Sequence, residues 1–273
     1  MLPSVSWIKR SASKHLGPFL GSHGWRPARS VPLADGYMNA SYGYDDEVEI
    51  KAAVRRVRSH TMTSFERLAT LWQQVRYLDR AEIQGGLVEC GTWRGGAVGM
   101  MALAHMARSE PTRTLQLFDS FEGLPRPTAT DGAAASRYAA GRTDGALDAI
   151  GACEAPLDDN RDLLERQLGY PKELLSYHVG WFQDTLPSAV EQIGSIALLR
   201  LDGDWYESTK VCLEALEPLV VPGGIVVIDD YGHWEGCRAA VDEYLEANPP
   251  PLLLSHVDYT ARYWIKPMVP GRA

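Results

Sequence analysis

Four short apolar runs of this 273-residue sequence each lead to a carboxylate. In chain order they deliver Glu89 ahead of a glycine-rich loop, Asp119, the triplet Asp202-Gly203-Asp204, and the adjacent pair Asp229 and Asp230. Short apolar runs that stop at such residues are typical of buried strands in a parallel sheet. Ligands of open α/β sheets bind beyond the carboxyl ends of the strands, so we expect these side chains to share one site.

The last two strand ends favour a divalent cation. Asp229 and Asp230 are adjacent, and Asp202 lies 229 − 202 = 27 residues earlier, about one strand–helix unit. Like charges at short range raise each other's pKa and are costly unless a cation neutralises them. Oxygen ligands without a Cys or His partner favour Mg²⁺, with Mn²⁺ as the alternative. We therefore predict a metal site of Asp202, Asp229 and Asp230, against the alternative that Asp229 and Asp230 only cap the next segment.

The first two strand ends favour a nucleoside-bearing cofactor. Glycines at 91, 95 and 96 let the backbone approach a ligand at the start of a helix. The carboxylate of Asp119 can accept hydrogen bonds from both hydroxyl groups of a ribose. The loop reads GxxxGG rather than GxGxxG, and Asp119 follows Gly91 by 119 − 91 = 28 residues, more than the usual ~20 of a dinucleotide site. The pattern therefore favours a cofactor with an amine and a positive charge, such as S-adenosylmethionine. Tight turns without a ligand are the alternative.

Strands and helices alternate around these residues. Strands are predicted over 86–90, 114–119, 174–179, 196–201 and 224–228. Helices are predicted over 96–108, 185–192, 208–219 and 235–247, and over 46–80, where residues 61–64 interrupt the helical pattern. This alternation predicts an α/β fold with a doubly wound, mostly parallel sheet. Residues 252–257 and 263–265 predict a closing antiparallel hairpin.

Two segments stand apart from this alternation. Residues 1–45 predict an N-terminal arm or lid, and residues 46–273 a single domain with a mobile insertion at about 126–160. The arm carries the aromatic residues Trp7, Trp25, Tyr37, Tyr42 and Tyr44. We expect them to anchor a partner subunit in a homo-oligomer, a dimer or higher. The alternatives are that the arm folds inward as a lid or is a disordered tail.

The composition of the sequence limits the kinds of partner and the cellular location that we expect. With 27 Lys and Arg against 35 Asp and Glu, the formal charge of −8 argues against nucleic-acid and membrane-surface partners. The four cysteines form no CxxC pair, and no apolar run is long enough for a signal peptide or a membrane span. These features predict a cytoplasmic protein.

Five segments in sequence resemble the macrocin O-methyltransferase family (TylF/MycF type), whose members methylate sugar hydroxyls of macrolides and other natural products. These segments read LVECGTWRGGA, LFDSFEGLP, GWFQDTLP, LLRLDGDWYEST and GGIVVIDDY, within about residues 60–245. The resemblance implies a Rossmann-like class I methyltransferase fold, S-adenosylmethionine, and Mg²⁺ held by the aspartates. It also implies a small-molecule glycoside as substrate, although residues 126–160 match no motif that would identify it.

The resemblance also assigns cofactor roles by motif. The residues implied are Glu89, Gly91 and Arg94 at the methionine end, Asp119 and Ser120 at the ribose and adenosine, Trp181 and Phe182 beside the adenine, and Thr61 and Met62 closing over the cofactor.

A bound cation lowers the pKa of a hydroxyl oxygen, but magnesium does so less than zinc, so a sugar hydroxyl still needs a base. Asp202 is the expected catalytic base, ahead of Asp204 and His233. Two other functions stay open at this point. Asp202-Gly203-Asp204 matches the DxD pattern of metal-dependent glycosyltransferases, and a non-catalytic cofactor-binding protein would keep the fold without needing the aspartates.

Overall fold

The computed structural model describes residues 38–107, 110–248 and 253–268. Within these residues a seven-stranded sheet has the order β3-β2-β1-β4-β5-β7-β6. Its strands are β1 (Gly86–Cys90), β2 (Leu115–Asp119), β3 (Leu175–Val179), β4 (Ile196–Leu201), β5 (Val220–Ile228), β6 (Ser255–His256) and β7 (Arg262–Ile265). Strands β1 to β5 pair in parallel, whereas β7 runs antiparallel to β5 and β6 antiparallel to β7, as the sequence predicts.

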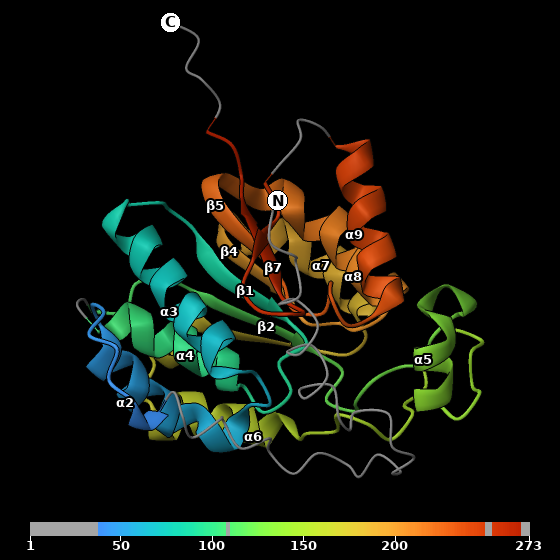
Figure 1. Ribbon diagram of the computed structural model, residues 1–273, viewed down its shortest axis with the longest axis horizontal. Helices are drawn as coiled ribbons and strands as arrows, with labels where there is room; N and C mark the ends of the chain where they lie inside the picture. Colours follow the sequence, from blue (N-terminus) through green and yellow to red (C-terminus); the bar gives the residue numbers. More distant parts are fainter. Residues whose placement is uncertain (1–37, 108–109, 249–252, 269–273) are drawn as a thin grey trace, which may run out of the picture.

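Helices cover both faces of the sheet (Figure 1). One face packs against α2 (Glu47–Val57), α3 (Phe65–Arg80) and α4 (Gly96–Met106), and the other against α7 (Phe182–Ile193), α8 (Tyr206–Leu216) and α9 (Glu235–Ala247). Successive side chains of a strand point to opposite faces. In β1, Leu87 accordingly packs among the first group of helices and Val88 among the second. Burial on both faces explains why the strands read as continuous apolar runs.

The insertion contributes two short helices, α5 (Gly132–Tyr138) and α6 (Leu157–Arg161), the latter continued by a π-helical turn over Asp162–Gln167. In Figure 1, α5 lies at the edge of the molecule, beyond α8 and α9. Asp131, just before α5, is nevertheless buried. Its carboxylate accepts hydrogen bonds from the backbone N–H of Thr128 at 2.7 Å and of Tyr206, the first residue of α8, at 2.6 Å. The insertion is thus attached to the helical layer, and its predicted mobility stays a prediction.

Most of the predicted arm, including Trp7, Trp25 and Tyr37, lies outside the described residues. Its last part is described: Glu47 accepts hydrogen bonds from the backbone N–H groups of Tyr42 and Gly43, which fixes the chain ahead of α2. Among the described residues no helix has the length and apolar character to cross a membrane.

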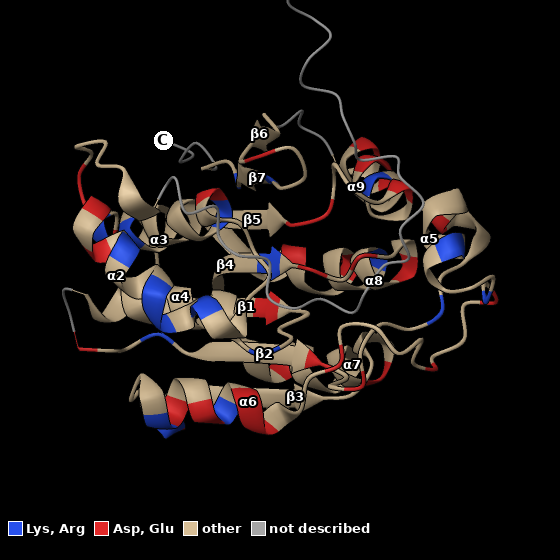
Figure 2. Cartoon of the chain, turned by 60° about the horizontal axis from the view of Figure 1, so that its bottom comes forward, with Lys and Arg blue, Asp and Glu red and all other residues tan. Residues whose placement is uncertain are grey.

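The strand order reverses direction beside β1, because β2 lies on one side of it and β4 on the other. In doubly wound sheets this switch point is where ligands bind. Acidic residues follow the ends of the central strands there (Figure 2).

Candidate active site

A cavity opens beyond the carboxyl ends of β1, β2, β4 and β5. Of the residues predicted from the sequence, those that line it are Met62, Gly91, Asp119, Ser120, Trp181, Phe182, Asp202, Asp204, Asp229 and Asp230. The structure therefore brings the glycine-rich loop and the aspartates of two later strands to one cavity.

The glycine-rich loop passes directly against the end of β4. Gly91 has φ +86°, and a Cβ built there would lie 1.9 Å from the carbonyl oxygen of Asp202. The backbone N–H of Asp202 in turn donates to the carbonyl of Cys90 at 2.8 Å. Only glycine fits this position, so the loop and Asp202 hold a fixed spacing.

Asp119 binds the same loop from β2. Its carboxylate accepts hydrogen bonds from the backbone N–H groups of Thr92 at 2.7 Å, Trp93 at 2.9 Å and Phe121 at 2.7 Å. Burial raises the pKa of Asp119 more than these donors lower it. Asp119 therefore fixes the loop while lining the cavity where a ribose is expected.

Arg200 lies at the centre of a buried charge network. Its guanidinium contacts Glu89, donates to Asp202 Oδ2 at 2.9 Å and pairs with Asp229 Oδ1 at 2.5 Å. Burial raises the pKa of Glu89 to about 8, and Arg200 opposes that shift. Burial lowers the pKa of Arg200, but Asp229, Asp202 and Glu89 more than offset this, so the guanidinium stays charged.

Asp229 uses both carboxylate oxygens in ion pairs. Oδ1 pairs with Arg200, and Oδ2 pairs with Arg67 of α3. Arg67 Nε also contacts Asp258 Oδ2 at 3.0 Å in the turn before β7. Asp229 therefore pairs with two guanidinium groups while it also lines the cavity.

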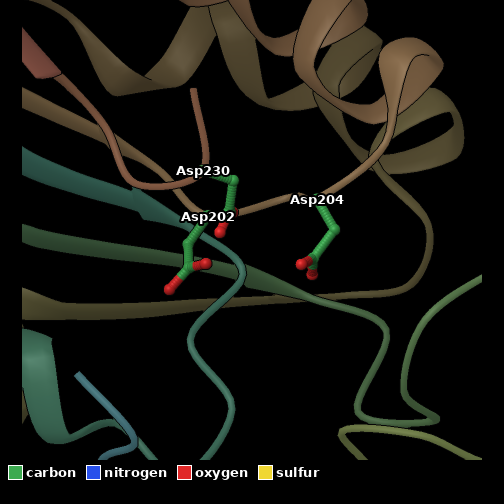
Figure 3. A group of neighbouring side chains, drawn as sticks. All are labelled: Asp202, Asp204 and Asp230. Carbon is green, nitrogen blue, oxygen red and sulfur yellow. The ribbon is translucent and has the colours of Figure 1, made fainter. Parts of the chain in front are cut away.

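Three other carboxylates gather instead. One oxygen from each of Asp202, Asp204 and Asp230 lies within 4.8 Å of the others, and Figure 3 shows the three side chains converging from the loops after β4 and β5. Burial raises the pKa of all three, and neighbouring carboxylates raise it further, that of Asp204 to about 8. Oδ2 of Asp230 is buried without a hydrogen-bond partner. An orphaned carboxylate oxygen beside two more carboxylates fits a hard divalent cation.

Comparison with known proteins identifies the family. Residues 38–266 match the sequence model of the macrocin O-methyltransferase (TylF) family. The chain belongs to the macrocin O-methyltransferase family. It is 36% identical over 206 residues to 8-demethyl-8-(2,3-dimethoxy-alpha-L-rhamnosyl)-tetracenomycin-C 4'-O-methyltransferase of Streptomyces olivaceus, covering 76% of this chain and 75% of that protein. It is also 36% identical over 222 residues to demethyldecarbamoylnovobiocin O-methyltransferase of Streptomyces niveus, covering 81% of each.

The solved structure of the O-methyltransferase NovP superimposes on this chain with a TM-score of 0.66 at 34% identity, covering 79% of this chain and 88% of that one. These matches confirm the predicted family, the Rossmann-like methyltransferase fold and the enzyme class, an S-adenosylmethionine-dependent O-methyltransferase.

Three predicted cofactor residues of this macrocin O-methyltransferase family member do not line the cavity. Thr61 is buried and accepts a hydrogen bond from the backbone N–H of Thr63. Glu89 is buried against Arg200. Arg94 pairs with Asp159 at 3.1 Å, and 44% of its side chain is exposed. Their roles as direct cofactor contacts stay predictions.

Sequence reasoning missed Arg67, Arg200 and Trp234 in this family member. Arg200 had a signal, because it is the one charged residue in the buried run IALLRL. Nothing in the local sequence pairs Arg67 with Asp229, 162 positions away. Trp234 is buried and donates its indole N–H to Oδ1 of Asp204 at 2.6 Å.

Proposed function

We propose that this O-methyltransferase transfers a methyl group from S-adenosylmethionine to a sugar hydroxyl of a glycosylated natural product, with Mg²⁺ bound by the aspartate cluster. The observation that carries this proposal is one cavity lined both by the glycine-rich loop and by Asp202, Asp204 and Asp230. The sugar is favoured because the name of the Streptomyces olivaceus relative specifies a rhamnosyl substrate.

The cofactor is assigned to the part of the cavity beside β1, β2 and α7. Gly91 and Asp119 line it at two strand ends, and Trp181 and Phe182 line it at the start of α7. Aromatic rings there suit a purine, and a strand-end carboxylate suits a ribose. Met62 lines the same cavity from the segment between α2 and α3, which supports its predicted closing role.

The cation is assigned to Asp202, Asp204 and Asp230. The sequence predicts Asp229 as the third ligand, and that stays a prediction. Here Arg67 and Arg200 pair with both oxygens of Asp229, whereas an oxygen of Asp204 lies within 4.8 Å of the other two carboxylates. We therefore propose that Asp229 holds the two arginines and that Asp204 supplies the third carboxylate. Weaker Mn²⁺ binding in Asp229→Asn than in Asp204→Asn would reverse this assignment.

When bound, Mg²⁺ would lower the pKa of the hydroxyl to be methylated. The proposed base is Asp202. Its Oδ2 accepts from Arg200 Nη1 at 2.9 Å, which leaves the two lone pairs of Oδ1 free, one for the cation and one for the hydroxyl proton. Arg200 also orients this carboxylate, which would keep the proton acceptor in place during transfer. His233 is less favoured, since it does not line the cavity and its ring nitrogen contacts the hydroxyl of Tyr259.

The glycosyltransferase alternative loses support because the family match covers residues 38–266. Asp204 lies in a tight turn with φ +57°, outside the strand, as Gly203 suggested, and this position is compatible with either function. The alternative of a non-catalytic cofactor-binding protein loses support as well, because the matched relatives are O-methyltransferases.

Binding and activity test the proposal together. We expect S-adenosylhomocysteine to raise the melting temperature and UDP-glucose to leave it unchanged. With a panel of rhamnosylated natural products, transfer of tritium from methyl-labelled S-adenosylmethionine should require Mg²⁺ and stop with EDTA. Asp202→Asn should lower the rate by at least about 10²-fold, the usual contribution of a positioned base. Asp184→Asn, at an exposed position of α7, is the matched control. Stabilisation by UDP-glucose alone would contradict the proposal.

A further inference from the structure

Asn160 of α6 reaches the glycine-rich loop, although 67 positions of the chain separate it from Trp93. The residue is fully buried, and its Nδ2 donates to the carbonyl of Trp93 at 2.6 Å. Its Oδ1 lies 2.5 Å from where a Cβ on Gly95 would be, and this oxygen is buried without a hydrogen-bond partner among the described residues. Asn160 therefore packs against the loop at Gly95 and makes its one directed contact with it at Trp93.

Trp93 has a backbone conformation that needs such support. Its φ of +47° lies in the left-handed region, which side-chain sterics disfavour for every residue except glycine. Its backbone N–H donates to Oδ2 of Asp119 at 2.9 Å, and its carbonyl accepts from Asn160. The two polar groups of Trp93 are thus held from two different elements, β2 and α6, and this fixes the plane of the loop.

Asn160 is itself held by the packing of its segment on α4. Leu163, in the π-helical turn that continues α6, is fully buried, and a Cβ on Gly99 of α4 would lie 3.0 Å from its Cδ2. Asp159, the residue before Asn160, pairs with Arg94 of the loop at 3.1 Å. That ion pair is partly exposed and contributes little, so the buried amide of Asn160 is the stronger link between α6 and the loop.

The loop that Asn160 supports belongs to the cofactor side of the cavity, which Gly91 and Trp93 both line. We propose that Asn160 is a positioning residue for the methyl donor: by holding the carbonyl of Trp93, it keeps the glycine-rich loop in the conformation that binds S-adenosylmethionine. This inference rests on the cofactor position proposed above. A loop that is already held in its binding conformation loses less conformational freedom when the ligand binds, and the affinity rises accordingly.

The test compares two substitutions in the same segment. Asn160→Ala leaves the carbonyl of Trp93 buried without its donor, whereas Leu163→Ala removes packing against α4. Binding of S-adenosylhomocysteine to the full chain is measured by isothermal titration calorimetry, and the melting temperature is recorded without ligand. We expect both variants to melt at lower temperature. Only Asn160→Ala should raise the dissociation constant of S-adenosylhomocysteine, by about tenfold, the effect of one lost buried hydrogen bond.

Should Asn160→Ala fail to fold, Asn160→Ser keeps a polar atom but is too short to reach the carbonyl of Trp93, and the same rise is expected. An unchanged dissociation constant in the folded variant, or equal weakening in Leu163→Ala, would overturn the role of Asn160 alone. Failure of the unmodified protein to bind S-adenosylhomocysteine would instead overturn the cofactor assignment, and the role of Asn160 with it.

Discussion

The side chain of Arg200 is 2% exposed and shares its guanidinium among Glu89, Asp202 and Asp229. An arginine fork suits this task, because its donors are directed and its charge persists when buried. Through these contacts one residue fixes the predicted base and satisfies one oxygen of Asp229. We therefore assign Arg200 a role in organising the site even though it does not line the cavity.

Replacing Arg200 by Met should destabilise the fold by about 3–5 kcal/mol, because removing one partner leaves buried carboxylates without compensation. Urea unfolding at pH 7 measures this loss. Arg76→Met is the control, since Arg76 is also buried but its Nη1 makes only longer contacts, 3.5 Å to Ala104 and 3.8 Å to Asp79. Equal unfolding midpoints in the two variants would show that the network adds nothing to stability.

Among the helices and strands, the insertion is held to the rest of the molecule through the carboxylate of Asp131. Its carboxylate lies at the start of α8, and a Cβ on Gly236 of α9 would meet its Oδ1 at 1.9 Å. The carboxylate also complements the positive end of the α8 dipole. The insertion is therefore held where the N-termini of two helices meet, close to Trp234, which donates to Asp204.

We expect Asp131→Ala to loosen residues 126–160 and to lower stability by roughly 1–3 kcal/mol, because buried backbone donors lose their acceptor. Amide hydrogen exchange should become faster across the insertion, while β1 and β4 keep their protection. Asp148→Ala serves as the control on the same insertion, since 58% of that side chain is exposed in its pair with Arg126. Exchange as slow in Asp131→Ala as in the control would contradict this anchoring.

The positions of most helices and strands can be predicted from the local sequence. The strand runs and the helix breaks depend on neighbouring residues, so their bounds agree with the prediction to within a few positions; β5 differs because it starts earlier, at Val220. The side-chain partners depend on residues far apart. Local patterns place Asp229 and Asp230 at one strand end, but only the fold decides that Asp229 turns to Arg67 and Arg200.

At the scale of the whole molecule, a second charge network closes the opposite end of the sheet. Asp79 of α3 accepts from Arg113 Nε at 2.8 Å and contacts Nδ1 of His105 of α4 at 2.9 Å. Arg113 also donates to the carbonyls of Gly85 and Ile83, just before β1. Ion pairs and hydrogen bonds thus connect α3, α4 and the segment before β1 at one end of the sheet, while the cavity lies at the other end.

The acid stability of the protein should depend on Asp79. Burial raises the pKa of Asp79, but His105 and Arg113 outweigh it, so the folded-state value lies below the unfolded value of about 3.9. The unfolded chain therefore takes up the proton first, and the stabilisation is full well above pH 4 and lost as the pH falls through the folded-state pKa.

Asp79→Asn should accordingly unfold at lower urea than the unmodified protein at pH 7, with the difference shrinking at pH 3. Asp158→Asn, at a side chain that is 83% exposed, should match the unmodified protein at both values. If the urea midpoint of Asp79→Asn lay below that of the unmodified protein by the same amount at pH 7 and at pH 3, Asp79 would not be the source of the acid dependence.

The central claim is that the carboxylates after β4 and β5 hold a divalent cation beside the methyl donor. Its most direct test is a crystal structure with Mn²⁺ and S-adenosylhomocysteine, in which anomalous scattering locates the metal. We predict one anomalous peak bound by Asp202, Asp204 and Asp230, with the sulfur of S-adenosylhomocysteine facing it across the cavity. Bound S-adenosylhomocysteine without any anomalous peak among these carboxylates, at saturating Mn²⁺, would contradict it.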